Sequence, residues 1–598
     1  MLKYGPESLD YFRLCRDAKE VSEKAVSKKM KIALMADFAS QQLVTVLKTL
    51  FFKNGIYADV LEAEFDSIDH CIFSEQSPLE AFSPEIVLVL ESTQALRSKY
   101  YASAQGASAN FAAERAETSY ARWKKLRQKC PQAVILQSNF VLPYERPFGN
   151  YGHKIEGTFH ATVRGLNARV TESCAGRRDV FILDTDSTAS YVGKKSWFDE
   201  RLWALYKYPC ALEHVPLIAQ SIVDVALALK GSVIKCIIVD LDNTLWGGVI
   251  GDDGTEGIRL GHGDEGEAFL LFQSFLLELK KRGILLAVCS KNDPDNARLP
   301  FRQLPEMVLR EEDFAVFVAN WNDKPGNIRL IRETLNIGLD SILFLDDSVF
   351  ERNLVRQTLP DVVVPELPED PADFIKFLSE MNVFETASHS EADASRTRMY
   401  QEEFQRKSSQ AHFDNHEDYL RSLDMKISLE RCTLRHLPRL VQLLQRSNQF
   451  NLATRRYSEA QCGSFMNDVP GHLPLCITLS DKYGDYGLIS AVIVSWRGTE
   501  AVIEEWVMSC RVLFRGVEQC VMNFIFDTAR QKGLRRVTGN YIPSDKNKMV
   551  KDFYHDFGFK PGEGAGIGGG SRWALDVSQY KPIKTHMEID GLCLPQNA

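Results

Sequence analysis

The sequence predicts a multidomain α/β protein, and three observations lead to this class. The chain has 598 residues, which is too long for a single hydrophobic core. Apolar runs of strand length alternate with helical patterns from about residue 31 to 230 and again from about 234 to 378, as in parallel sheets covered by helices. From about residue 425 onwards the pattern becomes a mixture of strands and helices, which indicates an α+β block.

The composition excludes several classes of protein. Hydrophobic residues make up 44% and charged residues 25%, which is ordinary for a soluble globular protein. The net charge of -9 argues against nucleic acid as a partner. The N-terminus lacks the apolar core of a secretory signal, and we expect no membrane span, because no apolar run approaches about 20 residues.

The cysteines indicate a reducing environment. There are 13, an odd number, and none forms a C-x-x-C pair. A zinc site or a disulfide framework is therefore not expected. Reduced thiols and a cytoplasmic location fit this pattern best.

The elements of the first block can be placed from periodicity. Residues 1–28 have the pattern of a polar helical leader, and residues 196–229 are largely helical in pattern. Strands are expected at KIALMADF, IVLVLE and AVILQSNF, and a helix is expected over 41–55.

The second block repeats this alternation. Its expected strands are CIIVDL, ILLAVCS, AVFVAN and ILFLDD, with helices over 265–282 and 325–336. A charged, helical connector follows at 382–424. The glycine-rich run at 562–571 lacks the Lys-Ser/Thr of a P-loop, so we expect a flexible, hairpin-like loop there.

Two carboxylates at the end of the first strand of the second block are the main chemical signal. Asp240 and Asp242 lie at positions i and i+2, so both can project from one rim of the sheet. Carboxylates held this close repel each other unless a cation lies between them, and Mg²⁺ is a suitable ion. Taken alone, the pattern is equally typical of an Asp-rich turn.

Three further strand ends carry matching side chains. Ser290 closes the second strand, Lys324 begins a helix after the third, and Asp346-Asp347 close the fourth. This order of D-x-D-x-T, then S, then K, then D-D resembles the haloacid dehalogenase superfamily of phosphotransferases.

The resemblance implies a role for each residue. Asp240 would accept the phosphoryl group, and Asp242 would exchange protons with the leaving group and with water. Ser290 and Lys324 would neutralise phosphoryl oxygens. The metal ligands would be Asp240, Asp242, Asp346 and Asp347, with Asp347 favoured over its neighbour, and the substrate-binding residues would include Thr244 and Asn292.

The spacing of the motifs leaves no room for a large inserted cap. Ser290 follows Asp240 by 50 residues, and Lys324 follows Ser290 by 34. We therefore expect a Rossmann-like domain with an open site, accessible to a bulky substrate.

Longer strings resemble a narrower family. DLDNTLWGGVIGDDGTEGIRLG, AVCSKNDP, NWNDKPGNI, FLDDSVFERNLV and RSNQFNLATRRY are similar to the FkbH-like family of polyketide assembly lines. The resemblance implies a glyceryl-loading enzyme that uses Mg²⁺ and 1,3-bisphosphoglycerate. The acceptor would be the phosphopantetheine thiol of a holo acyl carrier protein. Cys289 could accept the acyl group as a thiolate, or could simply be a core residue.

The third block resembles N-acetyltransferases of the GNAT type. The string from Arg511 to Gly516 corresponds to their coenzyme A loop, but Phe514 stands where a glycine is expected. The resemblance implies a carrier or pantetheine site with Arg511, Arg515, Gly516, Asn547 and Tyr554. Asn448, Asn451 and Arg455 could bind a polar ligand or could belong to a capped, solvated turn.

The first block resembles SGNH hydrolases, but it lacks their nucleophile. Phe38 follows Asp37 where an active member has serine. Asn139 and His214 could fill other SGNH positions. Without the serine we expect no hydrolysis, and this domain is predicted to be a scaffold or docking domain.

The predicted domains are 1–230 (SGNH-like), 231–381 (haloacid-dehalogenase-like), the connector at 382–424, and 425–598 (GNAT-like). Three functions fit this layout. The first is glyceryl transfer to a carrier protein. The second is a stand-alone phosphatase acting on a small phosphorylated metabolite, and the third is a non-catalytic module that recruits carrier proteins.

Overall fold

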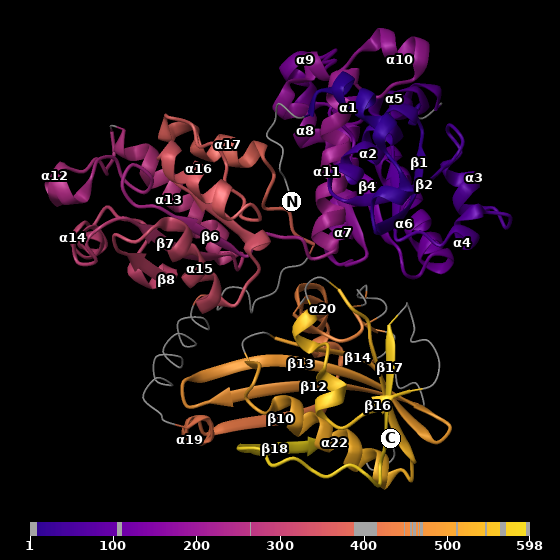
Figure 1. Cartoon of the computed structure of the whole chain (residues 1–598). Coiled ribbons are helices and arrows are strands. Elements are labelled where there is room, and N and C mark those ends of the chain that lie inside the picture. The colour runs from indigo at the N-terminus through magenta and orange to yellow at the C-terminus, as the bar shows by residue number, and fades with distance from the viewer. Residues whose placement is uncertain are drawn as a thin grey trace. The chain divides into compact units, whose positions relative to one another are not determined.

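The computed structural model describes residues 9–103, 110–263, 265–387, 397, 415–447, 449–454, 457, 462–463, 466, 471–509, 512–544, 547–562 and 570–593. The chain divides into two compact units (Figure 1). One is formed mainly by residues 2–228, and the other by residues 229–457 and 462–598. The domain boundaries predicted at 381 and 424 remain predictions.

The first unit contains a parallel five-stranded sheet in the order β2-β1-β3-β4-β5. Strands β1, β3 and β4 confirm the three predicted strands, whereas β2 and β5 were not predicted. Its strands are β1 (Lys28–Ala36), β2 (Ile56–Glu62), β3 (Ile86–Leu90), β4 (Val134–Ser138) and β5 (Val180–Leu183). Its helices are α1 (Tyr11–Asp17), α2 (Gln41–Lys53), α3 (Ile68–Phe73), α4 (Pro78–Phe82), α5 (Thr93–Ala102), α6 (Phe111–Lys129), α7 (Phe159–Ala175), α8 (Thr185–Val192), α9 (Lys194–Trp197), α10 (Glu200–Tyr206) and α11 (Val215–Leu229).

The structure corrects two expectations for this unit. In the part of the predicted helical leader that the structure describes, residues 9–28, the one α-helix is the seven-residue α1, which two short 3₁₀ turns follow. The stretch Leu212–Leu229, which includes α11, is apolar and long enough to cross a membrane, although no such run was expected. Of this stretch, 67% is buried inside the structure, as in the core helix of a folded domain.

The second block forms a parallel four-stranded sheet in the order β8-β7-β6-β9, which confirms its four predicted strands. The strands are β6 (Cys236–Val239), β7 (Leu285–Ser290), β8 (Phe314–Ala319) and β9 (Ile342–Leu345). The helices are α12 (Ile250–Gly257), α13 (Gly266–Lys281), α14 (Leu299–Gln303), α15 (Lys324–Leu335), α16 (Val349–Thr358) and α17 (Phe374–Glu380). Every residue of β6, β7 and β9 is buried, as expected for strands covered on both faces.

The third block is a mixed sheet in the order β16-β17-β15-β14-β13-β12-β10-β18, with the short β11 paired to β14. Its strands are β10 (Met425–Arg431), β11 (Phe450–Asn451), β12 (His472–Asp481), β13 (Gly484–Arg497), β14 (Glu500–Met508), β15 (Arg536–Tyr541), β16 (Lys560–Pro561), β17 (Ser571–Asp576) and β18 (Met587–Cys593). Its helices include α19 (His416–Ser422), α20 (Leu437–Arg446), α22 (Val517–Gln531) and α23 (Phe553–Asp556).

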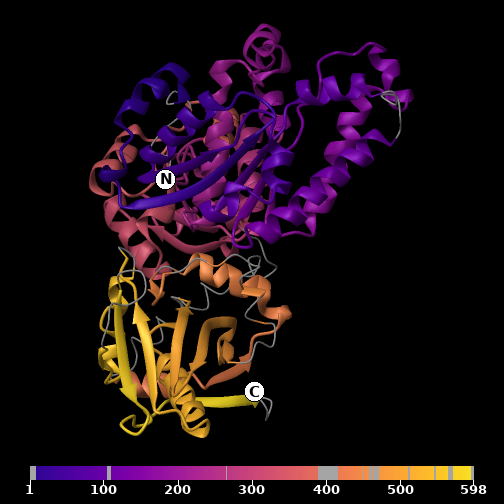
Figure 2. The ribbon, with the colours of Figure 1, turned by 90° about the vertical axis from the view of Figure 1, so that its right-hand side faces the viewer.

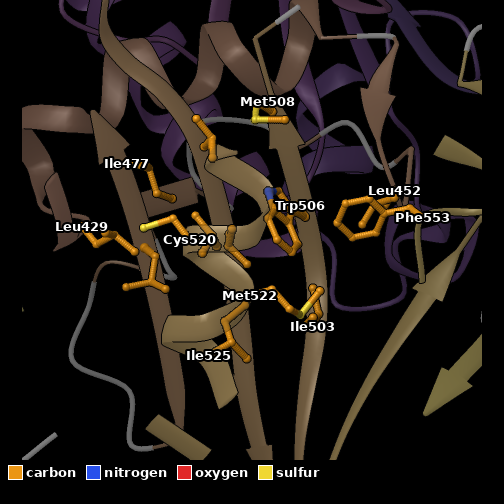
Figure 3. Packing of buried hydrophobic residues seen from close by; sticks show 14 of the residues in the cluster. Leu429, Leu452, Ile477, Ile503, Trp506, Met508, Cys520, Met522, Ile525 and Phe553 are labelled. Carbon is orange, nitrogen blue, oxygen red and sulfur yellow. The ribbon is translucent and has the colours of Figure 1, made fainter. Parts of the chain in front are cut away.

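The core of this block forms where α22 lies against the sheet (Figures 2 and 3). Cys520, Met522 and Ile525 of the helix belong to one buried cluster with Trp506 of β14. Cys432 and Cys476 form a disulfide in a second buried cluster, which includes Leu440 of α20, and the expectation of reduced thiols did not anticipate it. Most of the predicted connector and of the glycine-rich loop lies outside the described residues.

The close packing around Gly539 in this core can be tested by a substitution. A Cβ atom at Gly539 of β15 would lie 2.3 Å from the Tyr554 hydroxyl, and that side chain is only 1% exposed. We expect Gly539→Ala to destabilise the sheet by about 1–3 kcal/mol, because an overpacked core must distort. Hydrogen–deuterium exchange of β14 and β15 peptides should become faster.

Gly463→Ala is the control, because an added Cβ there meets nothing within 4 Å. Equal exchange rates in the wild type and Gly539→Ala would contradict this packing.

Candidate active site

A buried lysine joins the ends of the sheet strands in the second block. The Lys324 Nζ atom lies 2.8 Å from Asp240 Oδ2 and 2.5 Å from Asp346 Oδ2. All three residues are buried, and Lys324 is only 2% exposed. Lys324 reaches this place because Asp323 caps the start of α15, where its side chain accepts a hydrogen bond from the Gly326 amide.

The carboxylates around this lysine could hold a metal ion. Oxygen atoms of Asp240, Asp346 and Asp347 lie within 4.8 Å of one another. Asp240 Oδ1 is buried and has no hydrogen-bond partner in the described part of the chain. Such an oxygen is costly to bury unless something binds it, so these residues fit a hard divalent cation.

Asp242 is held in place by the loop that follows β6. Its Oδ1 accepts hydrogen bonds from the Trp246 indole and the Ile250 amide, both at 3.0 Å. Its Oδ2 accepts one from the Asn292 side chain at 2.9 Å. Asn292 therefore lies at the site as predicted, but it contacts Asp242 and orients this carboxylate.

The other predicted residues of this domain also lie at the carboxyl ends of the strands. Ser290 is the last residue of β7 and is 2% exposed. Thr244 is fully buried, and its hydroxyl has no hydrogen-bond partner among the described residues. Lys291, the residue after Ser290, forms an ion pair with Glu351 at 2.6 Å.

Burial and mutual repulsion shift the pKa values of the acidic groups upwards. Burial raises the pKa of Asp346 to about 7, and the charge of Asp240 acts in the same direction. Burial also raises the pKa values of Asp242 and Asp347. Burial alone would lower the pKa of Lys324, but Asp240 and Asp346 raise it above its ordinary value. The lysine is therefore charged, and it offsets part of the negative charge of the cluster.

Arg352 is a residue of this site that the sequence reasoning missed. From α16 it donates hydrogen bonds to the backbone carbonyls of Asp346 and Asp347, both at 2.7 Å. Its other nitrogens donate to Glu366 at 3.0 and 3.1 Å. Arg352 is 4% exposed and fixes the turn that carries the acidic pair.

Cys289 packs in the core beside the site, and its sulfur lies 4.0 Å from the backbone carbonyl of Lys324. It is fully buried in a cluster with Cys236 and Ile238 of β6 and with Ile328 of α15. Burial raises the pKa of this thiol well above its ordinary value. Strand residues alternate between faces, so a Ser290 at the site leaves Cys289 in the core. Of the two alternatives left open for Cys289, this packing favours the core residue, and a role as an acyl-accepting thiolate stays a prediction.

Two of the residues predicted in the third block, Asn547 and Asn451, form hydrogen bonds within the protein. Asn547 is fully buried and donates to the carbonyls of Asn451 and Ile542 at 2.8 and 2.9 Å. The Asn451 Oδ1 atom accepts a hydrogen bond from the Thr454 amide at 2.6 Å. Tyr554 is buried, and its hydroxyl has no hydrogen-bond partner in the described structure. The predicted site residues Asn448, Arg455 and Arg511 lie outside the described residues.

The described residues of the loop before α22, which the sequence resemblance compared with a coenzyme A loop, contact other residues of the protein. Arg515 is 6% exposed and its guanidinium lies 3.7 Å from Asp481. Gly516, with φ of 91°, precedes α22, and Phe514, with φ of 63°, is 73% exposed. The Phe514 amide donates to the buried Glu518 in the first turn of α22, where a pyrophosphate would otherwise bind.

The SGNH positions of the first unit have separate partners. Asn139 donates to Asp184 at 2.7 Å, whereas the His214 Nε2 atom lies 2.8 Å from the Ser196 hydroxyl. Asp37 is buried and accepts a hydrogen bond from the Ser92 amide. Burial and Glu91 raise the pKa of Asp37 to about 7.

Comparison with known proteins identifies the family. Residues 31–227 match the family model for the FkbH N-terminal domain. The N-terminal part of protein BF1531 from Bacteroides fragilis is 36% identical to this chain, with a TM-score of 0.60. The match covers 63% of this chain and 99% of that one, which is described as containing a phosphatase domain complexed with Mg. The chain belongs to the FkbH-like family.

Other solved structures resemble this FkbH-like protein much less. The ribosomal-protein-S18-alanine N-acetyltransferase of Escherichia coli is 14% identical, with a TM-score of 0.20, and the match covers 28% of this chain and 99% of that one. The GNAT domain of S. lividans PAT is 21% identical, with a TM-score of 0.21. That match covers 25% of this chain and 89% of the other chain. Such low scores support no conclusion about the third block. No curated protein matches the chain significantly.

The role of Arg352 leads to a prediction about metal affinity. We expect Arg352→Gln to weaken Mg²⁺ binding by about 10- to 100-fold, as is typical when a residue that orients metal ligands is lost. Isothermal titration calorimetry with MgCl₂ measures this change.

The matched control is Arg356→Gln. Arg356 lies one turn further along α16 and donates to the Val364 carbonyl at 3.0 and 3.1 Å. Equal losses of affinity in both variants would contradict a specific role for Arg352.

Proposed function

We propose that this protein removes a phosphate group from 1,3-bisphosphoglycerate with Mg²⁺ and transfers the glyceryl group to the thiol of a holo acyl carrier protein. The observation that supports the first half most strongly is the ion triad of Lys324, Asp240 and Asp346 beside an unpartnered Asp240 oxygen. The relative from Bacteroides fragilis, with its Mg-complexed phosphatase domain, also supports it. A site without a large cap, as the spacing of the motifs predicts, would admit a carrier-bound arm.

The phosphoryl half of the reaction follows from the positions of the residues. A carboxylate oxygen of Asp240 attacks phosphorus, and the bond from phosphorus to the ester oxygen breaks. Asp242 gives a proton to that oxygen and later takes one from the water that hydrolyses the aspartyl phosphate. Lys324 and Ser290 balance the charge on the phosphoryl oxygens. When bound by Asp240, the Asp242 carbonyl and Asp347, Mg²⁺ would supply further positive charge there.

The acyl half needs a thiol and an acyl phosphate. The pantetheine thiolate attacks the acyl carbon, the bond from carbon to the phosphate oxygen breaks, and inorganic phosphate leaves. In our proposal the thiol belongs to the carrier protein, because Cys289 is packed in the core. The third block would position the carrier, in line with its GNAT-like pattern.

A second candidate is a phosphatase that acts on a free metabolite. The burial of Cys289 favours it, because the described residues at the strand ends then offer phosphoryl chemistry without a thiol. Both candidates use the same carboxylates.

The catalytic role of Asp240 can be tested by an isosteric change. We expect Asp240→Asn to lower phosphate release by at least about 10³-fold, since an amide is a poor nucleophile and a poor metal ligand. Phosphate release measures the rate, and intact mass spectrometry detects the phosphoenzyme.

The control is Asp361→Asn, which alters an exposed carboxylate in the segment after α16. Retained activity in Asp240→Asn would count against the mechanism.

The carrier requirement separates the two candidate functions. With Mg²⁺, 1,3-bisphosphoglycerate and holo carrier, we expect the carrier to gain the mass of one glyceryl group, while apo carrier stays unmodified. Intact mass spectrometry of the carrier reads this out. Rapid steady phosphate release without any loading of the holo carrier would favour the plain phosphatase.

A further inference from the structure

The first unit contains a cavity of about 570 Å³ that the proposed function does not use. It lies beside the end of α5, the segment around residues 145–153, and the start of α7. These segments follow strands β3 and β4 in the chain, and no residue of the sheet itself lines the cavity. Its size is typical of sites for small organic ligands.

Aromatic rings provide the apolar part of the cavity. Tyr100 and Phe159 are buried, and their ring centroids lie 5.1 Å apart. Tyr101 and Phe148 also line the cavity and are 67% and 54% exposed. Exposed rings at the mouth of a cavity can stack on a flat ligand group.

Positively charged and titratable groups share the same walls. Arg146, Arg164, His153 and His160 all line the cavity. The Arg164 Nη1 atom lies 3.4 Å from His153 Nδ1, and Arg146 donates to the Asn150 side chain at 2.6 Å. Among the described residues, neither arginine has a carboxylate within ion-pair distance. Glu145 also lines the cavity, but it forms an ion pair with Arg97.

The backbone adds to this positive character. The first turn of α7, from Thr158 to Ala161, lines the cavity, and α7 is 17 residues long. The N-terminus of a helix carries a partial positive charge and favours anions. The pKa of His160 is lowered by burial and by Arg164, Lys194, Arg146 and His153, which indicates excess positive charge around it.

Phe38, which stands where SGNH hydrolases have their nucleophilic serine, does not line this cavity. Phe38 lines a different cavity of only about 30 Å³, together with Ser138 and Trp197. That space holds about one water molecule. Of these two cavities, only the larger has room for an organic ligand.

We infer that the cavity of the first unit binds a phosphate monoester attached to a flat aromatic group. The two guanidiniums, the imidazoles and the start of α7 match a doubly charged phosphate, to which arginine binds in a bidentate manner. The rings of Tyr101 and Phe148 match the aromatic group. This inference is independent of the proposed reaction, because it uses none of the residues around Asp240.

The test uses adenosine 5′-monophosphate as the probe and the full-length protein in EDTA, so that the magnesium-dependent site does not contribute. We expect saturable binding with one site per chain in isothermal titration calorimetry. Adenosine or inorganic phosphate alone should bind at least about tenfold more weakly, since each makes only part of the contacts.

Variants locate the binding site. Arg146→Gln and Arg164→Gln should each weaken binding by about tenfold or more, the usual effect of losing a charged hydrogen bond. The matched control is Arg169→Gln, an exposed arginine of α7 that does not line the cavity.

Two measurements complete the test: the stability of each variant and its affinity for the nucleotide. A midpoint of thermal unfolding equal to that of the wild type shows that the fold of each variant is intact. Absence of saturable binding at millimolar nucleotide, or equal affinity in Arg146→Gln, Arg164→Gln and the wild type, would overturn the inference.

Discussion

The candidate active site depends on one buried ammonium group. Lys324 lies between Asp240 and Asp346, which are supplied by two neighbouring strands, β6 and β9. Without this charge, two buried carboxylates would repel each other across a medium of low dielectric constant. Lys324 itself begins a helix after β8, so the triad links three of the four strand ends of the sheet. The positions of Asp242 and Asp347 follow from this arrangement, because each is a close neighbour in sequence of a triad carboxylate.

Much of this arrangement could be predicted from the sequence, for a physical reason. Parallel strands that are buried on both faces appear as continuous apolar runs, and their carboxyl ends meet at one edge. The polar residues that end these runs could therefore be assigned to one site before any coordinates were known. The strands around Asp240, Ser290 and Asp346 illustrate this, as does the expected role of Lys324.

Other features lacked such a signal. Arg352 acts through backbone carbonyls, which leave no trace in a pattern of side chains. The side chain of Cys289 could face either the site or the core. Which one it faces depends on the alternation of side chains along β7, and the sequence did not settle this. The pairing of Cys432 with Cys476 joins residues 44 positions apart, and a count of cysteines cannot reveal it. The cavity beside α7 is formed by residues that are scattered over three segments and match no motif.

The third block shows how a resemblance can agree in pattern while its site differs. Its loop before α22 has Phe514 in place of glycine and a buried Glu518 at the helix start. These features oppose the binding of a pyrophosphate by the backbone.

The most direct test of the central claim is a crystal structure of the protein grown with Mg²⁺ and beryllium fluoride, which mimics a phosphoryl group on a carboxylate. We expect a fluoroberyllate on Asp240 within hydrogen-bond reach of Lys324 and Ser290, with Mg²⁺ beside it on Asp347. Electron density for neither group at Asp240, or for a metal ion bound away from the triad, would contradict the central claim.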